Sequence, residues 1–149
     1  MGLDEYRRKR DAGKTTEPFD DEVEVDRPVY VIQRHQASHL HWDLRLEFEG
    51  VLKSWAVPKE PPKDAGVRRL AVQTEDHPLA YASFEGEIPK GEYGGGSVEI
   101  WDSGTFQLLE KTEGKIIIDI KGRVLKGPYV LVRTKQAGGR NWLFFKMKP

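Results

Sequence analysis

The chain contains no cysteine. Disulfide bonds, thiolate metal sites and cysteine nucleophiles are therefore excluded, and any metal must be bound by histidine, carboxylate or other oxygen ligands. There is also no excess of either charge, because 24 lysines and arginines balance 24 aspartates and glutamates. This balance removes the case for general attraction to nucleic acid, although a local basic groove would still act on its own surroundings.

Long hydrophobic runs are absent as well. No apolar run approaches the roughly 18 residues that cross a bilayer, and the N-terminus lacks the apolar core of a signal peptide. We therefore expect a cytoplasmic protein with no membrane partner. The 149 residues, of which 38% are hydrophobic and 32% charged, are enough for one globular domain with its own core.

The first 28 residues differ in composition from the rest. They combine a basic cluster at residues 7–10 with an acidic stretch from Glu17 to Asp26, and they contain few large apolar residues. We predict a flexible charged N-terminal arm over residues 1–28, followed by a folded domain over residues 29–149. Composition alone favours a tail without a role.

The remainder has short β-strand patterns and no long stretch with a helical period. Residues 40–48 alternate strictly between apolar and polar side chains, which predicts a strand with its apolar face in the core. Residues 75–96 are predicted to be mostly loop, and residues 102–104 to form a turn between two strands. Short strands separated by glycine turns predict an all-β fold, an antiparallel barrel or a sandwich. The predicted strands cover residues 29–35, 40–48, 51–57, 69–74, 97–101, 105–110, 115–121, 127–134 and 142–148.

The strongest chemical signal is a histidine cluster. His35, His39 and His41 lie within seven residues, next to Asp43. The alternation places His39, His41 and Asp43 on the polar face of the strand, together with Arg45 and Glu47. A row of ionisable side chains is usually a solvated surface, but three histidines beside an aspartate give a metal site equal standing.

Strand geometry limits which of these residues can share a metal. Residues i and i+2 lie about 6.6 Å apart along a strand, so His41 can share a metal with either Asp43 or His39. A third ligand must come from a neighbouring strand, for which His35 is the nearest candidate, and spacing does not choose between His35 and His39. Imidazole and carboxylate without sulfur suit manganese, zinc, iron or nickel better than calcium.

Other polar residues are ambiguous when each is taken alone. The Arg45 guanidinium matches a phosphate bidentately, but it could equally pair with Asp43 or Glu47. His77 lies before a proline, where a turn and a surface position are expected. The glycines of GEYGGG, residues 91–96, lack the ending of a phosphate-binding loop and predict a tight turn before a strand.

Several blocks together resemble a known family. They are VIQRHQASHLHWDLRLE, WAVPKEP, EDHPLAYASFEGEIPKGEYGGG and VEIWDSGTF. In this order they resemble the 3′-phosphoesterase domain of ligase D, the DNA ligase of bacterial non-homologous end joining, and its free-standing relatives. The resemblance runs from KRDAGKTTEP in the arm to NWLFFKMKP at the end of the chain.

The resemblance implies an antiparallel β-barrel with a surface active site and a manganese-dependent hydrolase, for which zinc or cobalt are alternative metals. Such enzymes act at the 3′ end of a DNA or RNA–DNA primer–template. They remove a terminal ribonucleoside and then the remaining 3′-phosphate, which leaves a 3′-OH. The chain carries no polymerase or ligase domain, so we expect it to work with a separate ATP-dependent DNA ligase and a Ku-like protein.

The resemblance also implies roles for individual residues. His35, His41 and Asp43 match the metal ligands, whereas His39 becomes a mere neighbour. Arm residues are expected to act in the ribonucleoside step, so the arm becomes a flap over that end. The matching catalytic, phosphate-binding residues are Arg45, His77 and Tyr81, and the matching substrate-binding residues are Gln33, Lys59, Arg69, Arg10, Asp11 and Glu17.

The function and two roles in the reaction stay open at this stage. A cupin-like metal barrel would need His39 as a ligand, and a non-catalytic module that binds DNA ends would keep the fold without the activity. A purely structural barrel leaves the histidine cluster unexplained. His77 could act as a cationic phosphate donor or as the acid that protonates the leaving oxygen. The group that activates the attacking water is not identified.

Overall fold

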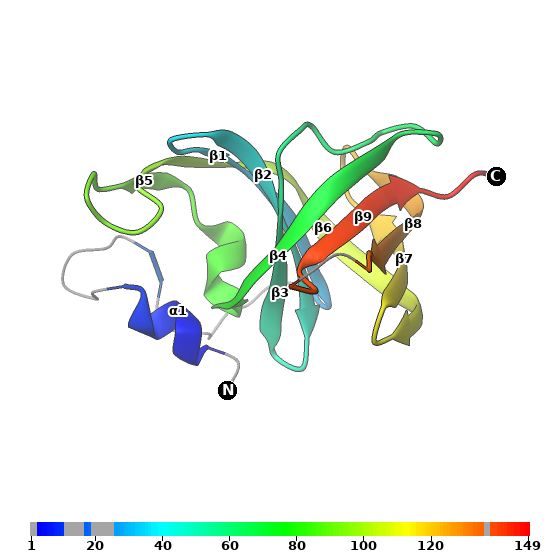
Figure 1. The fold of residues 1–149 in the computed structure, drawn as a ribbon, viewed down its shortest axis with the longest axis horizontal. Coiled ribbons are helices and arrows are strands. Elements are labelled where there is room, and N and C mark those ends of the chain that lie inside the picture. The colour runs from blue at the N-terminus through cyan, green and yellow to red at the C-terminus, as the bar shows by residue number, and fades with distance from the viewer. Residues whose placement is uncertain (1–2, 11–16, 19–25, 136–137) are drawn as a thin grey trace.

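The computed structural model describes residues 3–10, 17–18, 26–135 and 138–149. The described residues are nearly all β (Figure 1), with one short helix, α1 (Asp4–Arg8), and one 3-10 helix, η1 (Leu79–Ser83). The strands are β1 (Val29–Gln36), β2 (Leu40–Phe48), β3 (Val51–Val57), β4 (Arg68–Pro78), β5 (Gly86–Ile88), β6 (Gly96–Thr112), β7 (Lys115–Lys121), β8 (Lys126–Arg133) and β9 (Asn141–Lys146).

Eight of these strands close an antiparallel barrel, in the order β1-β2-β3-β4-β9-β8-β7-β6 and back to β1. Closure depends on β6, whose first half pairs with β1 and whose second half pairs with β7. The short strand β5 adds to the start of β6. The predicted all-β class is confirmed, and the closed order selects the barrel over the sandwich.

Two local predictions were wrong. The turn at residues 102–104 does not exist, because β6 continues through it. Gly104 lets β6 bend past β7, since a Cβ there would lie 2.1 Å from the Lys121 carbonyl oxygen. His77 does not lie in a turn either, because β4 extends to Pro78 and carries His77 on a strand.

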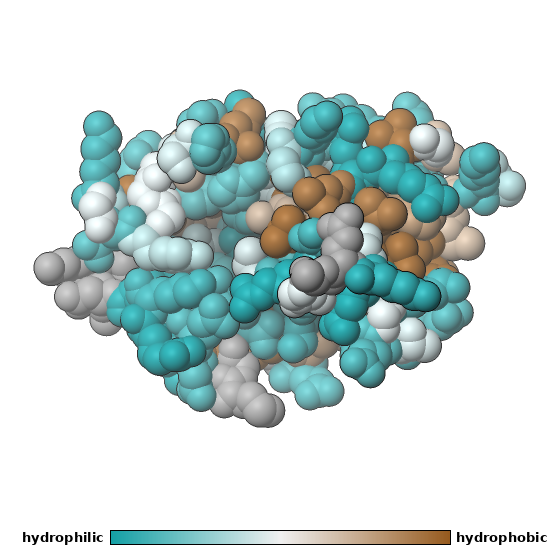
Figure 2. Space-filling view, viewed as in Figure 1, coloured by the Kyte–Doolittle hydropathy of each residue, from teal (hydrophilic) through white to brown (hydrophobic). Residues whose placement is uncertain are grey.

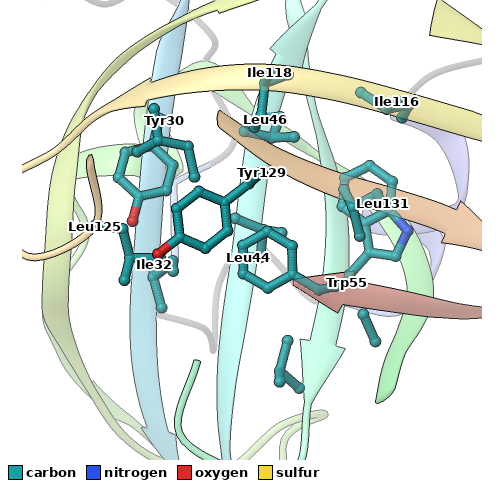
Figure 3. Packing of buried hydrophobic residues seen from close by; sticks show 14 of the residues in the cluster. Tyr30, Ile32, Leu44, Leu46, Trp55, Ile116, Ile118, Leu125, Tyr129 and Leu131 are labelled. Atoms are coloured by element: carbon teal, nitrogen blue, oxygen red, sulfur yellow. The ribbon is translucent and has the colours of Figure 1, made fainter. Parts of the chain in front are cut away.

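The barrel interior holds the main core (Figure 3). Alternate residues of β2 point into it, as the sequence predicts, and Leu44 and Leu46 are fully buried beside Trp55 of β3. Aromatic and aliphatic side chains, mostly from the other strands, fill the rest. Complete burial of such side chains stabilises a fold by about 1.5–3 kcal/mol each.

A second apolar cluster lies outside the barrel and covers the polar face of β2. It joins Tyr6 of α1 to Leu79 and Tyr81 at η1 and to Val31 of β1. In Figure 1, α1, η1 and β5 lie together on one side of the barrel. The polar row of β2 is therefore not a solvated surface, and its buried members are Asp43, Arg45 and Glu47.

The surface has one marked apolar region in the view of Figure 2, over β9. There Leu70 of β4, which is 42% exposed, pairs with Leu143 of β9. None of the described helices is long and apolar enough to cross a membrane.

Candidate metal and phosphate site

Two strands place the metal-ligand candidates together. In the β1–β2 register His35 lies directly opposite His41, and Gln33 lies opposite Asp43. Directly opposed residues of an antiparallel pair have Cβ atoms about 4.5–5.5 Å apart. The Asp43 Oδ2 atom lies 3.2 Å from His41 Nε2 and 3.6 Å from His35 Nδ1. Among the described residues, these three make the group whose ligand atoms all lie within 4.8 Å of one another.

Backbone carbonyls orient both histidine rings. The Gly94 oxygen lies 2.7 Å from His35 Nε2, and the His39 oxygen lies 3.1 Å from His41 Nδ1. Because a carbonyl only accepts, each of these ring nitrogens is a donor, and His35 Nδ1 and His41 Nε2 are the nitrogens that face Asp43. A second-shell hydrogen bond of this kind is typical of metal-binding histidines.

The donor set fits a divalent metal ion. Ligand bonds of roughly 2.0–2.2 Å at tetrahedral or octahedral angles place neighbouring ligand atoms about 3.0–3.5 Å apart, close to the 3.2 Å and 3.6 Å that separate Asp43 Oδ2 from the two histidine nitrogens. Burial alone would raise the pKa of the Asp43 carboxyl. The Arg45 guanidinium and the hydrogen bonds from His35 and His41 outweigh burial and hold that pKa well below its usual range. The carboxylate is therefore ionised and ready to bind a cation.

Arg45 follows Asp43 on the same face of β2 and is only 3% exposed. Its Nε donates to the Gln33 side-chain oxygen at 2.7 Å, and its Nη2 lies 3.4 Å from Asp43 Oδ2. Its guanidinium also lies 4.7 Å from the centre of the Tyr81 ring. Its Nη1 is buried and has no hydrogen-bond partner among the residues that the structure describes. An unpaired buried donor is costly, so this nitrogen is poised for an acceptor supplied by a ligand.

His77 and Tyr81 complete the wall opposite the metal group, with ring centroids 4.7 Å apart. Burial, together with the charges of Arg45 and Arg10, lowers the pKa of His77 well below its usual value, so the ring is neutral. The predicted cationic donor is therefore not present without a ligand. Burial raises the pKa of Tyr81, whose hydroxyl donates to Glu17 Oε2 at 2.7 Å.

Ion pairs hold the described part of the arm against the barrel. Arg10 donates to Glu17 at 2.8 Å and to Glu75 of β4 at 3.0 Å, and the side chains of all three are at most 4% exposed. Lys9 also reaches Glu75, at 3.3 Å. Asp11 lies outside the described residues. Glu75 is not among the residues predicted from the sequence, where its one available signal is its position two residues before His77 on the same strand.

The metal-ligand candidates, Arg45, the His77–Tyr81 wall and the arm line a cavity of about 310 Å³. It combines a buried cation, a buried anion and a histidine–carboxylate group in a small space. Its lining includes Arg10, Glu17, His35, His41, Asp43, Arg45, Glu75, His77, Tyr81, Tyr93 and Gly94.

Known proteins match this chain over most of its length. The model of the DNA ligase D 3′-phosphoesterase domain matches residues 33–133. The chain is 48% identical over 98% of its length to the multifunctional non-homologous end joining DNA repair protein LigD of Mycobacterium tuberculosis. It is 46% identical to the multifunctional non-homologous end joining protein LigD of Pseudomonas aeruginosa, and 45% identical to that of Mycolicibacterium smegmatis, again over 98% of its length. The chain belongs to the DNA ligase D 3′-phosphoesterase domain family.

The 3′-phosphoesterase chain spans about a fifth of the length of these curated relatives, from 18% to 20%. The family is named for a 3′-phosphoesterase, which is a hydrolase, and the curated relatives are named for non-homologous end joining. This agrees with the resemblance found in the sequence.

The 3′-phosphoesterase cavity gathers most, but not all, of the residues expected from sequence. Gln33 is fully buried behind Arg45, where it orients the guanidinium and donates to the Tyr81 carbonyl at 2.7 Å. Lys59 is exposed in the segment after β3 and does not line the cavity. Thr74 of β4 lines the cavity, whereas Arg69 lies on the opposite face of the same strand. Arg69 instead donates to the Glu60 carbonyl. A substrate role for Lys59 and Arg69 stays a prediction.

Proposed function

We propose that this 3′-phosphoesterase removes a 3′-terminal ribonucleoside from a DNA or RNA–DNA primer–template, and then removes the 3′-phosphate that remains. Manganese is the metal we expect, with zinc or cobalt as alternatives that the same ligands accept. The unpaired Nη1 of Arg45 beside the ionised Asp43 carries this proposal. It pairs an anion-binding donor with a cation-binding carboxylate, the combination that phosphate hydrolysis requires.

His35, His41 and Asp43 would hold the metal, which when bound polarises a phosphate oxygen and makes water more nucleophilic. Arg45 would hold further phosphate oxygens as negative charge builds on them. In the first step water attacks phosphorus and the bond to the 5′-oxygen of the leaving ribonucleoside breaks. In the second step the bond to the 3′-oxygen of the primer breaks, which gives a 3′-OH and inorganic phosphate.

The environment of His77 suits it to protonate the leaving oxygen. Its Nδ1 lies 3.0 Å from the Glu75 carbonyl, so Nδ1 carries the proton and Nε2 is the site that can gain another. The charges of Arg45 and Arg10 lower the pKa of His77. A bound phosphate offsets these positive charges and raises that pKa, so the acid forms where it is used.

A labelled primer–template with one 3′-terminal ribonucleotide tests the proposal. With Mn²⁺ we expect the ribonucleotide end to convert first to a 3′-phosphate end and then to a 3′-OH end. EDTA should stop both steps, because the carboxylate and imidazoles alone supply no Lewis acid. A junction that binds but is not cleaved with Mn²⁺, Zn²⁺ or Co²⁺ would instead identify a non-catalytic end-binding module. The 3′-OH product is what a DNA ligase needs, so a separate ATP-dependent ligase and a Ku-like protein are the partners we propose.

Removal of the ribonucleoside, but not of the 3′-phosphate, is expected to require the docked arm. Replacing Arg10 with alanine removes the guanidinium that pairs with both Glu17 and Glu75 and leaves Lys9 as the cation beside Glu75, so the arm is expected to leave the barrel. We expect ribonucleoside removal to fall on the order of 10²-fold, since loss of substrate positioning has effects of that size. At saturating Mn²⁺, removal of a 3′-phosphate, which uses groups of the barrel, should be largely retained.

Arg7→Ala is the matched control for Arg10→Ala, because Arg7 lies on α1, three residues before Arg10, and is exposed. The two steps are measured separately, on a ribonucleotide-ended and on a 3′-phosphate-ended primer. An equal loss of both steps in Arg10→Ala would mean that the arm supports the whole site and not the ribonucleoside step.

A further inference from the structure

The glycine-rich segment 91–96 contacts both the arm and a metal ligand. The sequence predicts only a tight turn there, and the proposed reaction gives the segment no role. We propose that Tyr93 is a positioning residue that couples docking of the N-terminal arm to metal binding at His35. The proposal rests on the metal site of the proposed function.

On the metal side, the segment supports His35 directly. The Gly94 carbonyl lies 2.7 Å from His35 Nε2 and so fixes the tautomer that leaves Nδ1 for the metal. Gly94 has a φ of +77°, and a Cβ at this position would lie 3.4 Å from His35 Cε1. A Cβ at Gly96 would lie 2.1 Å from the Gln36 oxygen, so the segment packs closely on the end of β1. A shift of the segment therefore moves the support of His35.

On the arm side, the contacts are made by Tyr93, the residue before Gly94. Lys9 Nζ lies 3.3 Å from the Tyr93 hydroxyl and 4.7 Å from the centre of its ring. The Arg10 guanidinium lies 5.2 Å from the same ring centre. Tyr93 is 49% exposed. Cation–π contacts stabilise even half-exposed aromatic side chains, so undocking of the arm removes a restraint on this tyrosine.

The arm has a second attachment that does not touch the metal ligands. Lys9 and Arg10 also pair with Glu75 of β4, whose carboxylate forms the base of the ion-pair network. A change at Tyr93 therefore leaves this attachment in place and removes only the path from the arm to Gly94. A change at Tyr93 therefore distinguishes coupling between the arm and the metal site from simple undocking of the arm.

Coupling of this kind must be reciprocal. If a docked arm favours metal binding, the bound metal must favour the docked arm by the same factor. The amides of Arg7 and Lys9 report docking, because each donates within the arm helix, to Leu3 and Glu5 respectively. Their hydrogen exchange should slow when metal binds, without any substrate present.

The test uses the full chain, with Mn²⁺ affinity read from the free-ion EPR signal and arm docking read from amide exchange. In Tyr93→Ala we expect Mn²⁺ binding to weaken about 10-fold, the lower end of second-shell effects, and the metal-dependent protection of the arm to disappear. Tyr93→Phe keeps the ring and should retain most of both effects. Leu109→Ala, which removes another half-exposed large side chain away from the cavity, is the matched control.

The outcomes separate this proposal from the proposed function. If Tyr93→Ala binds Mn²⁺ with unchanged affinity and metal still protects its arm, the coupling is wrong while the phosphoesterase site stands. If the unaltered chain binds none of Mn²⁺, Zn²⁺ or Co²⁺, both are wrong. Lys9→Ala tests the same path should Tyr93→Ala not fold, and it must also weaken Mn²⁺ binding, whereas Lys111→Ala, which removes another lysine over an aromatic ring, must not.

Discussion

Replacing His41 with alanine is expected to abolish both hydrolytic steps and Mn²⁺ binding together. The change removes one of three ligands and leaves the ionised, buried Asp43 with one imidazole on β1. Two remaining protein ligands do not hold a divalent ion against water at catalytic concentrations, since catalytic sites typically use three. The measurement is the free Mn²⁺ EPR signal beside single-turnover cleavage of ribonucleotide-ended and phosphate-ended primers.

The control for His41→Ala is His39→Ala, which lies two residues away on the chain. The His39 side chain is absent from the three-residue group, and its contribution is the backbone carbonyl that orients His41. Alanine keeps that carbonyl, so His39→Ala should bind metal and cleave as the unaltered chain does. Loss of metal in His39→Ala would favour the cupin-like arrangement, which requires that side chain as a ligand.

Sequence alone placed the right residue types on the right face of β2. Strict alternation over residues 40–48 puts His41, Asp43 and Arg45 together, and the strand has those bounds in the structure. The third ligand needed the partner strand, because only the β1–β2 register brings His35 opposite His41. Periodicity within one strand does not give the register between two strands. The choice between His35 and His39 therefore needs the family resemblance or the structure.

What the sequence left out depends on contacts between distant segments. Burial of the polar face of β2 comes from α1 and η1, which local alternation cannot foresee. The same is true of Glu75, 65 positions from the Arg10 that it binds. The missing turn in β6 has a different cause, since a glycine that permits a bend in one strand has the same signature as a glycine that ends it.

Arg45 carries the second large prediction. Arg45→Lys keeps one positive charge but loses the planar fork that lets one side chain bind Gln33, approach Asp43 and present a further nitrogen to the cavity. We expect both hydrolytic steps to slow on the order of 10²–10³-fold, the usual loss when one preorganised donor to a developing charge is removed. The loss should fall mainly on the rate of the bound complex, because the donor acts most strongly as charge accumulates on phosphorus-bound oxygens.

Arg133→Lys is the matched control for Arg45→Lys, because Arg133 also has a buried nitrogen without a partner, yet it lies outside the cavity. Its replacement should leave both steps unchanged, which separates the loss of an arginine fork from the loss of this particular fork. A full rate in Arg45→Lys, with kcat and KM both preserved, would show that the unpaired Nη1 does not serve the transferring phosphate. The unpaired donor would then have no ligand to explain it, and the phosphate would have to be held by the metal and the Tyr81–His77 wall alone.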